Sequence, residues 1–227
     1  MDWSWSFAFE ILPQLVEGVK ITVFASLLGS AVAMIMGCAI AIGRRSELPL
    51  VALLLRYFVE FVRGTPLLVQ LYVVFYMLPD IGIFLSPLTA GVITLGVHYS
   101  SYTSEVYRAG IDNVERGQWE AAKALNLTRF QVWRHVIIPQ AVPPMVPALA
   151  NYVVSMFKET PLLSVITVVE LMSQARIVAN INYRYLEPIT MVGAFFLAVS
   201  VPAVAGLRFL ERRYALQPKR SSYQSVL

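Results

Sequence analysis

"ITVFASLLGSAVAMIMGCAIAIG", residues 21–43, is a run of 23 residues without a charged side chain. At about 1.5 Å of rise per helical residue, such a run crosses a hydrocarbon core of about 30 Å, so it predicts a membrane-spanning helix. The rest of the chain has the same character, because 57 % of its 227 residues are apolar and 14 % are charged. This composition is typical of a polytopic membrane protein and excludes an ordinary soluble domain.

Four further apolar segments complete the predicted fold, an all-α polytopic membrane protein with five transmembrane helices in a single domain over residues 1–227. Three of these segments are uncharged runs, at residues 81–104, 140–157 and 188–207. The run at 67–78 is too short alone and spans only if residues 50–62 precede it in the same helix, which brings Arg56, Glu60 and Arg63 into or near the membrane.

The distribution of Lys and Arg predicts the orientation of the spans. Taken in order, the connections place twelve basic residues on one side and three on the other. Because basic residues collect on the cytoplasmic side, we expect the N-terminus outside and the C-terminus in the cytoplasm. The net charge of +4 is then a signal of topology, and nucleic-acid binding is not expected.

The two ends of the chain are expected to lie against the membrane and in the cytoplasm, respectively. Residues 1–18 predict an interfacial amphipathic helix whose Trp3 and Trp5 suit the lipid headgroups. The start of the chain lacks the basic residues of a cleaved signal peptide, and residues 210–227 form the predicted cytoplasmic tail. The single cysteine, Cys38, excludes an internal disulfide.

Residues 111–139 form a polar segment between the third and fourth spans, and they predict two short helices joined by a turn. The first helix covers residues 117–125 and ends at Asn126, which tolerates a left-handed backbone. Thr128 and Gln131 have the spacing of a capping box, so a second helix starts there and is expected to end at Pro139.

Within this segment, "EAAKALNLTRFQVWRHVIIP" at residues 120–139 resembles the EAA loop of ABC importer permeases. Glu120, Ala121, Ala122 and Pro139 match the pattern, while Asn126 replaces its usual glycine. Four other stretches are similar to the polar-amino-acid branch of this family: "LPQLVEGVKIT" (12–22), "RGTPLLVQL" (63–71), "YRAGIDNVERGQWEAA" (107–122) and "NYVVSMFKETPLLSVI" (151–166, with Pro161 in place of the usual Ser).

The resemblance implies a type I importer permease fold and an assembly of several proteins. It implies two permease chains, identical or related, two cytoplasmic ATP-binding subunits and a solute-binding protein outside. The ATPase-coupling residues it implies are Glu120, Ala121, Ala122, Lys123, Ala124, Leu125 and Asn126. The small alanines allow a partner to approach closely, and Glu120 can accept charge-assisted hydrogen bonds.

No catalytic, cofactor or metal site is expected in this chain. Gly91 and Gly96 have the separation of a phosphate-binding loop, but Val97 and His98 follow where such a loop has Lys and Ser or Thr. The two histidines, His98 and His135, lie far apart and have no cysteine ligand nearby. The resemblance implies that ATP hydrolysis belongs to a separate subunit and that the chain lies in a bacterial inner membrane.

Polar side chains within the spans are the candidates for a substrate pathway, because burying a charge in the membrane costs roughly 2.5–3.5 kcal/mol. The candidates are Tyr102, Glu105, Asn151, Ser155, Lys158 and Glu159. The charges could instead form internal pairs, of Arg56 with Glu60, Glu60 with Arg63, and Lys158 with Glu105. Pro66 and Pro161 predict breaks in their helices.

The resemblance implies alternating access driven by the partner ATPase, with a polar amino acid, an ectoine-type compatible solute or an opine as substrate. An ion-coupled secondary transporter remains an alternative, although such proteins usually have more spans and internal repeats. A structural or signalling membrane subunit would need no such cytoplasmic segment.

Overall fold

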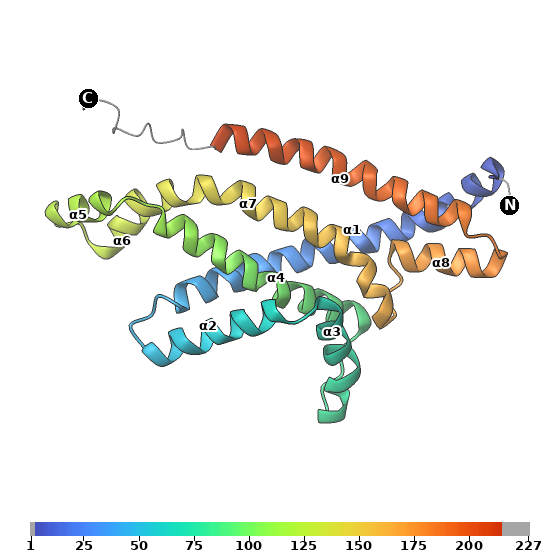
Figure 1. Cartoon of the computed structure of the whole chain (residues 1–227), viewed down its shortest axis with the longest axis horizontal. Coiled ribbons are helices and arrows are strands. Elements are labelled where there is room, and N and C mark those ends of the chain that lie inside the picture. Colours follow the sequence, from blue (N-terminus) through green and yellow to red (C-terminus); the bar gives the residue numbers. More distant parts are fainter. Residues whose placement is uncertain (1–2, 215–227) are drawn as a thin grey trace, which may run out of the picture.

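The structure, a computed structural model, describes residues 3–214 and consists of helices that mostly run along one long axis (Figure 1). In chain order they are α1 (Trp5–Gly43), α2 (Pro49–Gly64), α3 (Leu67–Tyr72), η1 (Val73–Met77), η2 (Leu78–Ile81), α4 (Pro87–Asp112), α5 (Arg116–Ala124), α6 (Arg129–Gln131), η3 (Val132–Ile137), α7 (Ile138–Glu159), η4 (Thr160–Ile166), α8 (Leu171–Asn182) and α9 (Leu186–Tyr214). No strand occurs in residues 3–214, which confirms the all-α fold.

Three of these helices are long and apolar enough to cross a membrane, over Trp5–Gly43, Arg129–Ile166 and Leu186–Arg212. The bent pair Pro49–Gly64 and Leu67–Ile81 adds a fourth if it counts as one span. The helix at the position of the expected third span is α4. It begins at Pro87 rather than at residue 81, and it is not among the helices that are long and apolar enough to cross a membrane. Its polar residues, among them Ser100, Ser101 and Thr103, are buried against other helices, so α4 does not need an apolar surface.

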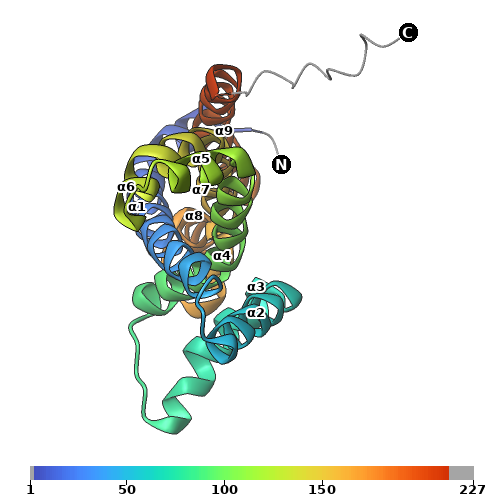
Figure 2. The ribbon, with the colours of Figure 1, turned by 90° about the vertical axis from the view of Figure 1, so that its left-hand side faces the viewer.

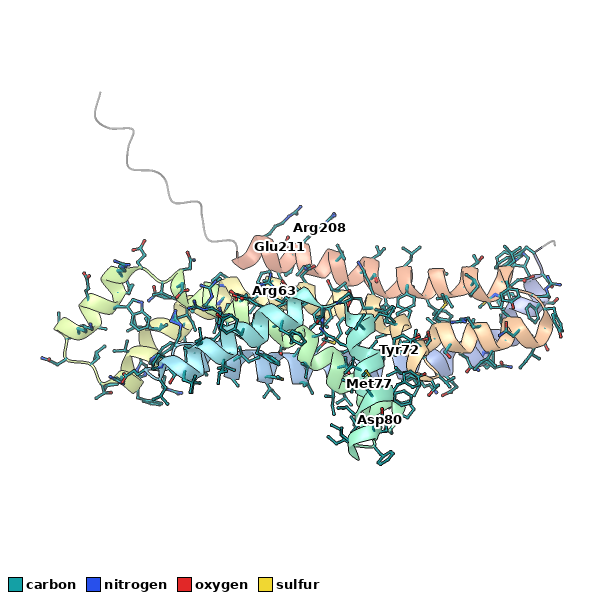
Figure 3. The ribbon with its side chains drawn as sticks, turned by 60° about the horizontal axis from the view of Figure 1, so that its bottom comes forward. Arg63, Tyr72, Met77, Asp80, Arg208 and Glu211 are labelled. Carbon is teal, nitrogen blue, oxygen red and sulfur yellow. The ribbon has the colours of Figure 1, made fainter. Side chains whose placement is uncertain are left out.

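The condition that residues 50–62 and 67–78 belong to one continuous helix is not met. The chain leaves α2 at Thr65 with extended backbone, and the helix pair bends by 104° at this break. Pro66 explains the break, as expected, because it lacks an amide hydrogen and restrains the residue before it. The α3–η1–η2 arm therefore projects from the bundle (Figures 1 and 2), and Tyr72, Met77 and Asp80 mark its length in Figure 3.

The Gln70 side chain supplies hydrogen bonds to backbone carbonyls where the helix is interrupted between α2 and α3. Its amide nitrogen lies 2.8 Å from the Val62 carbonyl oxygen and 3.2 Å from that of Thr65. Carbonyls at the end of a helix have no amide partner within the helix, and the Thr65 hydroxyl donates a second hydrogen bond of 3.3 Å to the Val62 carbonyl. The side-chain oxygen of Gln70 lies 3.1 Å from Nδ1 of His98, which ties the break to α4.

Helices α1 and α4 pack along a seam of small residues. A Cβ on Gly37 would meet the Thr103 side chain and lie 3.0 Å from the Ser100 carbonyl oxygen, so only glycine fits without a shift. The Thr103 hydroxyl donates a 2.8 Å hydrogen bond to the Ala33 carbonyl across the same seam. Close backbone approach with an interhelical hydrogen bond is a usual way to join helices in a membrane.

The end of the bundle that holds the N-terminus contains a helix, α8, where the sequence predicted only a loop between spans. Buried Glu170 caps it by accepting hydrogen bonds from the backbone amides of Met172 and Ser173. Burial raises the pKa of Glu170 above its usual value, against the effect of these two amide donors. Gly18 of α1 allows close packing here, since a Cβ would lie 2.7 Å from Leu171 Cα.

The predicted interfacial helix at residues 1–18 is not a separate helix over residues 3–18, the part of it that the structure describes. From Trp5 onward they continue into α1 through Pro13, with Ser4 as the N-cap. At the other end, α9 extends to Tyr214 and so takes up the first residues of the predicted tail, while residues 215–227 lie outside the described part of the chain.

Candidate functional site

The polar segment between α4 and α7 occupies the end of the bundle opposite α8 (Figure 1). Its first helix, α5, spans Arg116–Ala124, one residue earlier than predicted at each end. Asn126 follows with φ of 51°, which confirms the left-handed turn. The amides of Asn126 and Leu127 donate to the carbonyls of Lys123 and Ala122, at 2.9 and 3.1 Å. This is a Schellman motif with Asn in the position that glycine usually holds.

The second helix starts with the predicted capping box. The Thr128 hydroxyl accepts from the Gln131 amide, and the Gln131 side chain accepts from the Thr128 amide at 2.9 Å. The prediction that this helix ends at Pro139 is wrong, because η3 continues directly into α7. The π-helical turn of η3 widens the helix just before Pro139, which relieves the clash of the proline ring with the carbonyl four residues earlier.

The segment is packed firmly onto the ends of α4 and α7. The buried core there comprises Val114, Ile137, Ala141 and Met145. The rings of Trp119 and Trp133 meet edge to face with centroids 5.6 Å apart. Gly110 of α4 admits Met145 of α7, since a Cβ would lie 2.5 Å from Met145 Cγ. A displacement of α5 must therefore move α4 and α7 as well.

The predicted coupling residues divide between the inner and outer faces of α5. Ala122 is only 2 % exposed, so it packs inside the segment and cannot contact a partner directly. Exposed residues of the predicted set are Glu120, Ala121, Lys123, Ala124, Leu125 and Asn126.

Sequence reasoning missed one member of this surface, Phe130. Its side chain is 71 % exposed and that of Leu125 is 73 % exposed, although both lie in the polar segment. Exposed apolar side chains of this size mark contact surfaces. The available signal was an aromatic residue two positions after the capping threonine and directly after Arg129.

An ion-pair network joins the ends of α1 and α4 next to this segment. Glu105 pairs with Arg44 at 2.5 Å and with Arg108 at 2.7 Å, and Asp112 pairs with Arg45 and Arg108. The predicted pair of Glu105 with Lys158 therefore does not form.

The predicted pairs of Glu60 with Arg56 and Arg63 are also absent from the described residues, in which all three side chains are exposed. Arg63 instead stacks on Tyr102, with its guanidinium carbon 5.1 Å from the ring centroid.

Tyr102 belongs to an aromatic cluster between α4 and α7. Its ring centroid lies 5.4 Å from that of His98, 6.0 Å from that of Tyr99 and 5.6 Å from that of Tyr152. Glu159 borders this cluster through an interaction with Tyr99. One carboxylate oxygen of Glu159 is buried and has no hydrogen-bond partner. The structure thus brings Tyr102 and Glu159 to the same cluster and places Glu105 elsewhere.

The other pathway candidates lie along the same helix, α7. Asn151 and Ser155 share one face by their four-residue spacing, with Asn151 exposed and Ser155 half-buried. Lys158 borders a cleft of about 580 Å³ between α7 and α9, together with Ser200 and Arg208. At Pro161 the helix changes type rather than breaking, because α7 ends at Glu159 and a 3₁₀ helix continues from Thr160 within the helical stretch Arg129–Ile166.

Among residues 3–214, no group of three or more His, Cys, Asp or Glu side chains is arranged to hold a metal ion. His98 binds the Gln70 side chain, and His135 lies in the π-helical turn.

The comparisons with known proteins agree on one family. Residues 29–216 match the family described as binding-protein-dependent transport system inner membrane component. The chain is 42 % identical over 206 residues to a probable amino-acid ABC transporter permease protein of Sinorhizobium fredii (strain NBRC 101917 / NGR234), covering 91 % of this chain and 89 % of that protein. It is 34 % identical over 217 residues to the glutamine transport system permease protein of Escherichia coli (strain K12), covering 94 % and 98 %.

A solved structure titled as an amino acid ABC transporter with histidines superposes with a TM-score of 0.87 at 35 % identity, covering 94 % of this chain and all of that chain. A methionine ABC transporter in an inward-facing conformation shares the fold, with a TM-score of 0.67 at 16 % identity. These matches do not fit the alternative of an ion-coupled transporter. The chain therefore belongs to the family of binding-protein-dependent transport system inner membrane components and is a permease subunit of an ABC importer.

Proposed function

We propose that this permease carries a polar amino acid across the inner membrane and that the outer face of α5 receives the force from a partner ATPase. The proposal rests on helix α5. Its inner face packs against the ends of α4 and α7, while its outer face is exposed. The outer face combines small residues with one carboxylate, since Gly117, Ala121 and Ala124 accompany Glu120 at helical spacing. A Cβ on Gly117 would meet nothing within 4 Å.

Such a surface suits a groove on another protein. Small side chains let the partner's backbone approach, and Glu120 offers two oxygens to charged donors. Leu125 and Phe130 add exposed apolar area at the end of the segment. ATP binding can shift the permease between inward-open and outward-open states only through contacts that differ between them. We expect those contacts at α5, because the tryptophan pair and the core around Ile137 pass its movement to two long helices.

The test uses the full permease, expressed with the ATPase and the solute-binding protein of its host. Glu120→Arg reverses the charge of the outer face, and Ala121→Trp blocks close approach. Either change should remove copurification of the ATPase and reduce ATP-driven amino-acid uptake at least about tenfold, which corresponds to about 1.4 kcal/mol of lost coupling. Retention of both activities in both variants would contradict the proposal.

Glu47→Arg is the matched control. Glu47 follows α1 near the same end of the molecule, is exposed, and makes only a long ion pair of 3.7 Å with Arg129. The same charge reversal there should leave copurification and uptake unchanged, because exposed pairs contribute little. Ala122→Trp is unsuitable as a docking test, since a buried position would disrupt the segment itself.

The proposed pathway follows the face of α4 and α7 that carries the aromatic cluster, with Tyr102 and Glu159 as contacts and Asn151, Ser155 and Lys158 further along. Support comes from the partly buried rings and the unpaired carboxylate oxygen. Polar amino acids are favoured as substrates because the two relatives above are named for amino-acid and glutamine transport. Uptake of ectoine or an opine in place of any amino acid would contradict this choice.

The assembly we propose has two permease chains, five spans in each, an outside N-terminus and a cytoplasmic C-terminus. A second permease chain is supported by α2, where Arg56 and Glu60 are exposed without ion pairs inside the described chain. Lipid tails cannot solvate these charges, so a protein or a water-filled path must cover them. The apolar surface of α1, α7 and α9 faces lipid in this arrangement.

A further inference from the structure

Helix α2 carries a stripe of three charged side chains. Arg56, Glu60 and Arg63 follow one another at spacings of four and three residues, so they lie along one side of the helix. All three side chains are exposed, whereas Val59 and Val62 face the bundle and are buried. A charged stripe on a helix of a membrane protein needs water or another protein beside it.

The charges of Arg56 and Glu60 have no ion-pair partner within the described part of the chain. Their order explains why they do not pair with each other, because an arginine four residues before a glutamate pairs less well along a helix than the reverse order. Arg63 is held elsewhere, with its guanidinium carbon 5.1 Å from the centroid of the Tyr102 ring, and Figure 3 shows it on α2 against the bundle. Arg56 and Glu60 therefore offer one charge of each sign to a partner from outside the chain.

Large apolar side chains flank this stripe on the exposed side of α2. Leu53, Tyr57 and Phe61 follow at four-residue spacing and are 45, 61 and 69 % exposed. Leu53 precedes Glu60 by about two turns, so it lies where the apolar side chains meet the charges. An apolar centre with aromatic residues, bordered by charges, is typical of a contact surface between proteins.

A second copy of the chain is complementary to this surface. Two copies with the same orientation in the membrane are related by a two-fold axis along the membrane normal. Because α2 runs mostly along the long axis of the bundle (Figure 1), two α2 helices paired about that axis lie side by side and parallel. Arg56 and Glu60 differ in height by about 6 Å, which an arginine side chain can span. Each Arg56 then reaches Glu60 of the other copy, so the ion pair forms twice.

We infer that the second permease chain of the assembly is another copy of this chain, joined through α2 by two reciprocal ion pairs between Arg56 and Glu60. The inference rests on the proposed function and adds the identity of the second chain and the surface that binds it. A stripe that holds both signs of charge is complementary to itself, so it needs no second kind of chain. Charge pairs of this kind fix the register and the partner of parallel helices.

The first experiment is cross-linking in membranes of cells that express the permease with the ATPase and the solute-binding protein of its host. In a Cys38→Ser background, Leu53→Cys should join two permease copies through a short bis-maleimide, because residue 53 lies beside the axis. Ile35→Cys is the matched control, since this side chain of α1 is 74 % exposed and should give almost no dimer product. Charges that faced only a water-filled path would leave Leu53→Cys without product, and that result overturns the inference.

Charge reversal in the same Leu53→Cys chain tests the ion pairs. Arg56→Glu and Glu60→Arg each place like charges opposite one another at both pairs, so each should lower the yield of dimer product at least about tenfold. The double variant restores both pairs with the charges exchanged, and its yield should return to within about twofold of the parent. A substitution that only disturbed folding would be at least as harmful in the double variant, so recovery separates binding from structure.

Co-expression of the two single variants tests whether the pairs join different copies. An Arg56→Glu chain and a Glu60→Arg chain, each with its own tag, meet with opposite charges at both pairs, although neither chain matches itself. The product should therefore contain both tags and little of either tag alone. Glu211→Arg is the matched control, because Glu211 is exposed on α9 (Figure 3) and the same charge reversal there should leave the yield unchanged.

The inference is overturned if the two single variants together give no more product than each alone, or if the double variant recovers nothing. A product from Ile35→Cys in place of Leu53→Cys would put the second copy on α1 and overturn it as well. If the complete assembly takes up none of the twenty common amino acids, the proposed function itself fails. Because the dimer product is measured without transport, these failures are distinguishable.

Discussion

Asn126 holds a backbone conformation that few residues tolerate. Its φ of 51° closes the Schellman motif at the end of α5. Asn reaches this region more readily than other side chains because it has a short polar group, but glycine reaches it without steric cost. The turn of the polar segment at residues 111–139, the proposed coupling segment, is therefore stable with Asn and would be more stable with Gly.

Replacing Asn126 with glycine should stabilise the folded permease by roughly 0.3–1 kcal/mol, whereas Asn126→Val should destabilise it by roughly 1–2 kcal/mol. The reason is that a β-branched side chain clashes with its own backbone in the left-handed region. The apparent melting temperature of the purified permease should rise for the first variant and fall for the second. A valine variant as stable as the wild type would contradict the assigned turn.

Single residues also show what sequence reasoning could reach. The left-handed Asn126 and the capping box of Thr128 and Gln131 were predictable, because each depends on residues within a few positions. The pair of Arg44 with Glu105 joins residues 61 positions apart, so no local pattern identifies it. The same limit applies to Arg63, whose contact with Tyr102 arises only when α2 folds back on α4.

At the scale of helices, the seam between α1 and α4 depends on the absence of side chains. Gly37 lies against Thr103 and the backbone of Ser100 and Ser104. The Thr103 hydroxyl completes the contact by its bond to the Ala33 carbonyl. These two helices therefore behave as one unit, to which the ion pairs of Glu105 add at the end next to the polar segment.

Gly37→Ala should separate this seam and destabilise the permease by roughly 1–3 kcal/mol, because the added methyl group meets backbone that cannot move aside. Gly193→Ala is the control, since a Cβ at this position of α9 would meet nothing within 4 Å. Both changes raise helix propensity equally, so only packing differs between them. Thermal unfolding in detergent should show a lower midpoint for Gly37→Ala alone. Equal midpoints would contradict the tight seam.

The elements also show why prediction from the sequence was incomplete. Pro66 identified the position of the break between α2 and α3 but not the bend of 104°. The bend brings Gln70 into contact with His98, which lies 28 residues further along the chain. Pro139 led to the wrong prediction that the second helix of the coupling segment ends there, because the π-helical turn before it accommodates the proline ring. α8 was missed because its buried face packs on α1 and α9 through contacts far apart in the sequence.

For the molecule as a whole, the coupling segment and α8 lie at opposite ends of the bundle (Figure 1). The proposed orientation puts the coupling segment in the cytoplasm and the turn after the arm, near Phe84, outside. Both regions offer exposed positions for labelling, such as Lys123 and Phe84.

In a Cys38→Ser background, Phe84→Cys should react with a membrane-impermeant maleimide added to intact spheroplasts, and Lys123→Cys should react only after the membrane is opened. The expectation follows from the excess of basic residues on the side of the coupling segment. Lysed spheroplasts serve as the control for intrinsic reactivity. The reverse pattern would show that the orientation is inverted.

The most direct test of force transmission through α5 is cross-linking at two adjacent positions of that helix. Ala121 is exposed on the outer face and Ala122 is buried beneath it. In the Cys38→Ser background, Ala121→Cys labelled with a short maleimide–benzophenone reagent should form a photo-cross-link to the ATPase subunit, in a yield that changes when ATP is bound. Ala122→Cys should form almost none. If Ala121→Cys gave no more product than Ala122→Cys in the active assembly, α5 would not be the site at which the ATPase drives the permease.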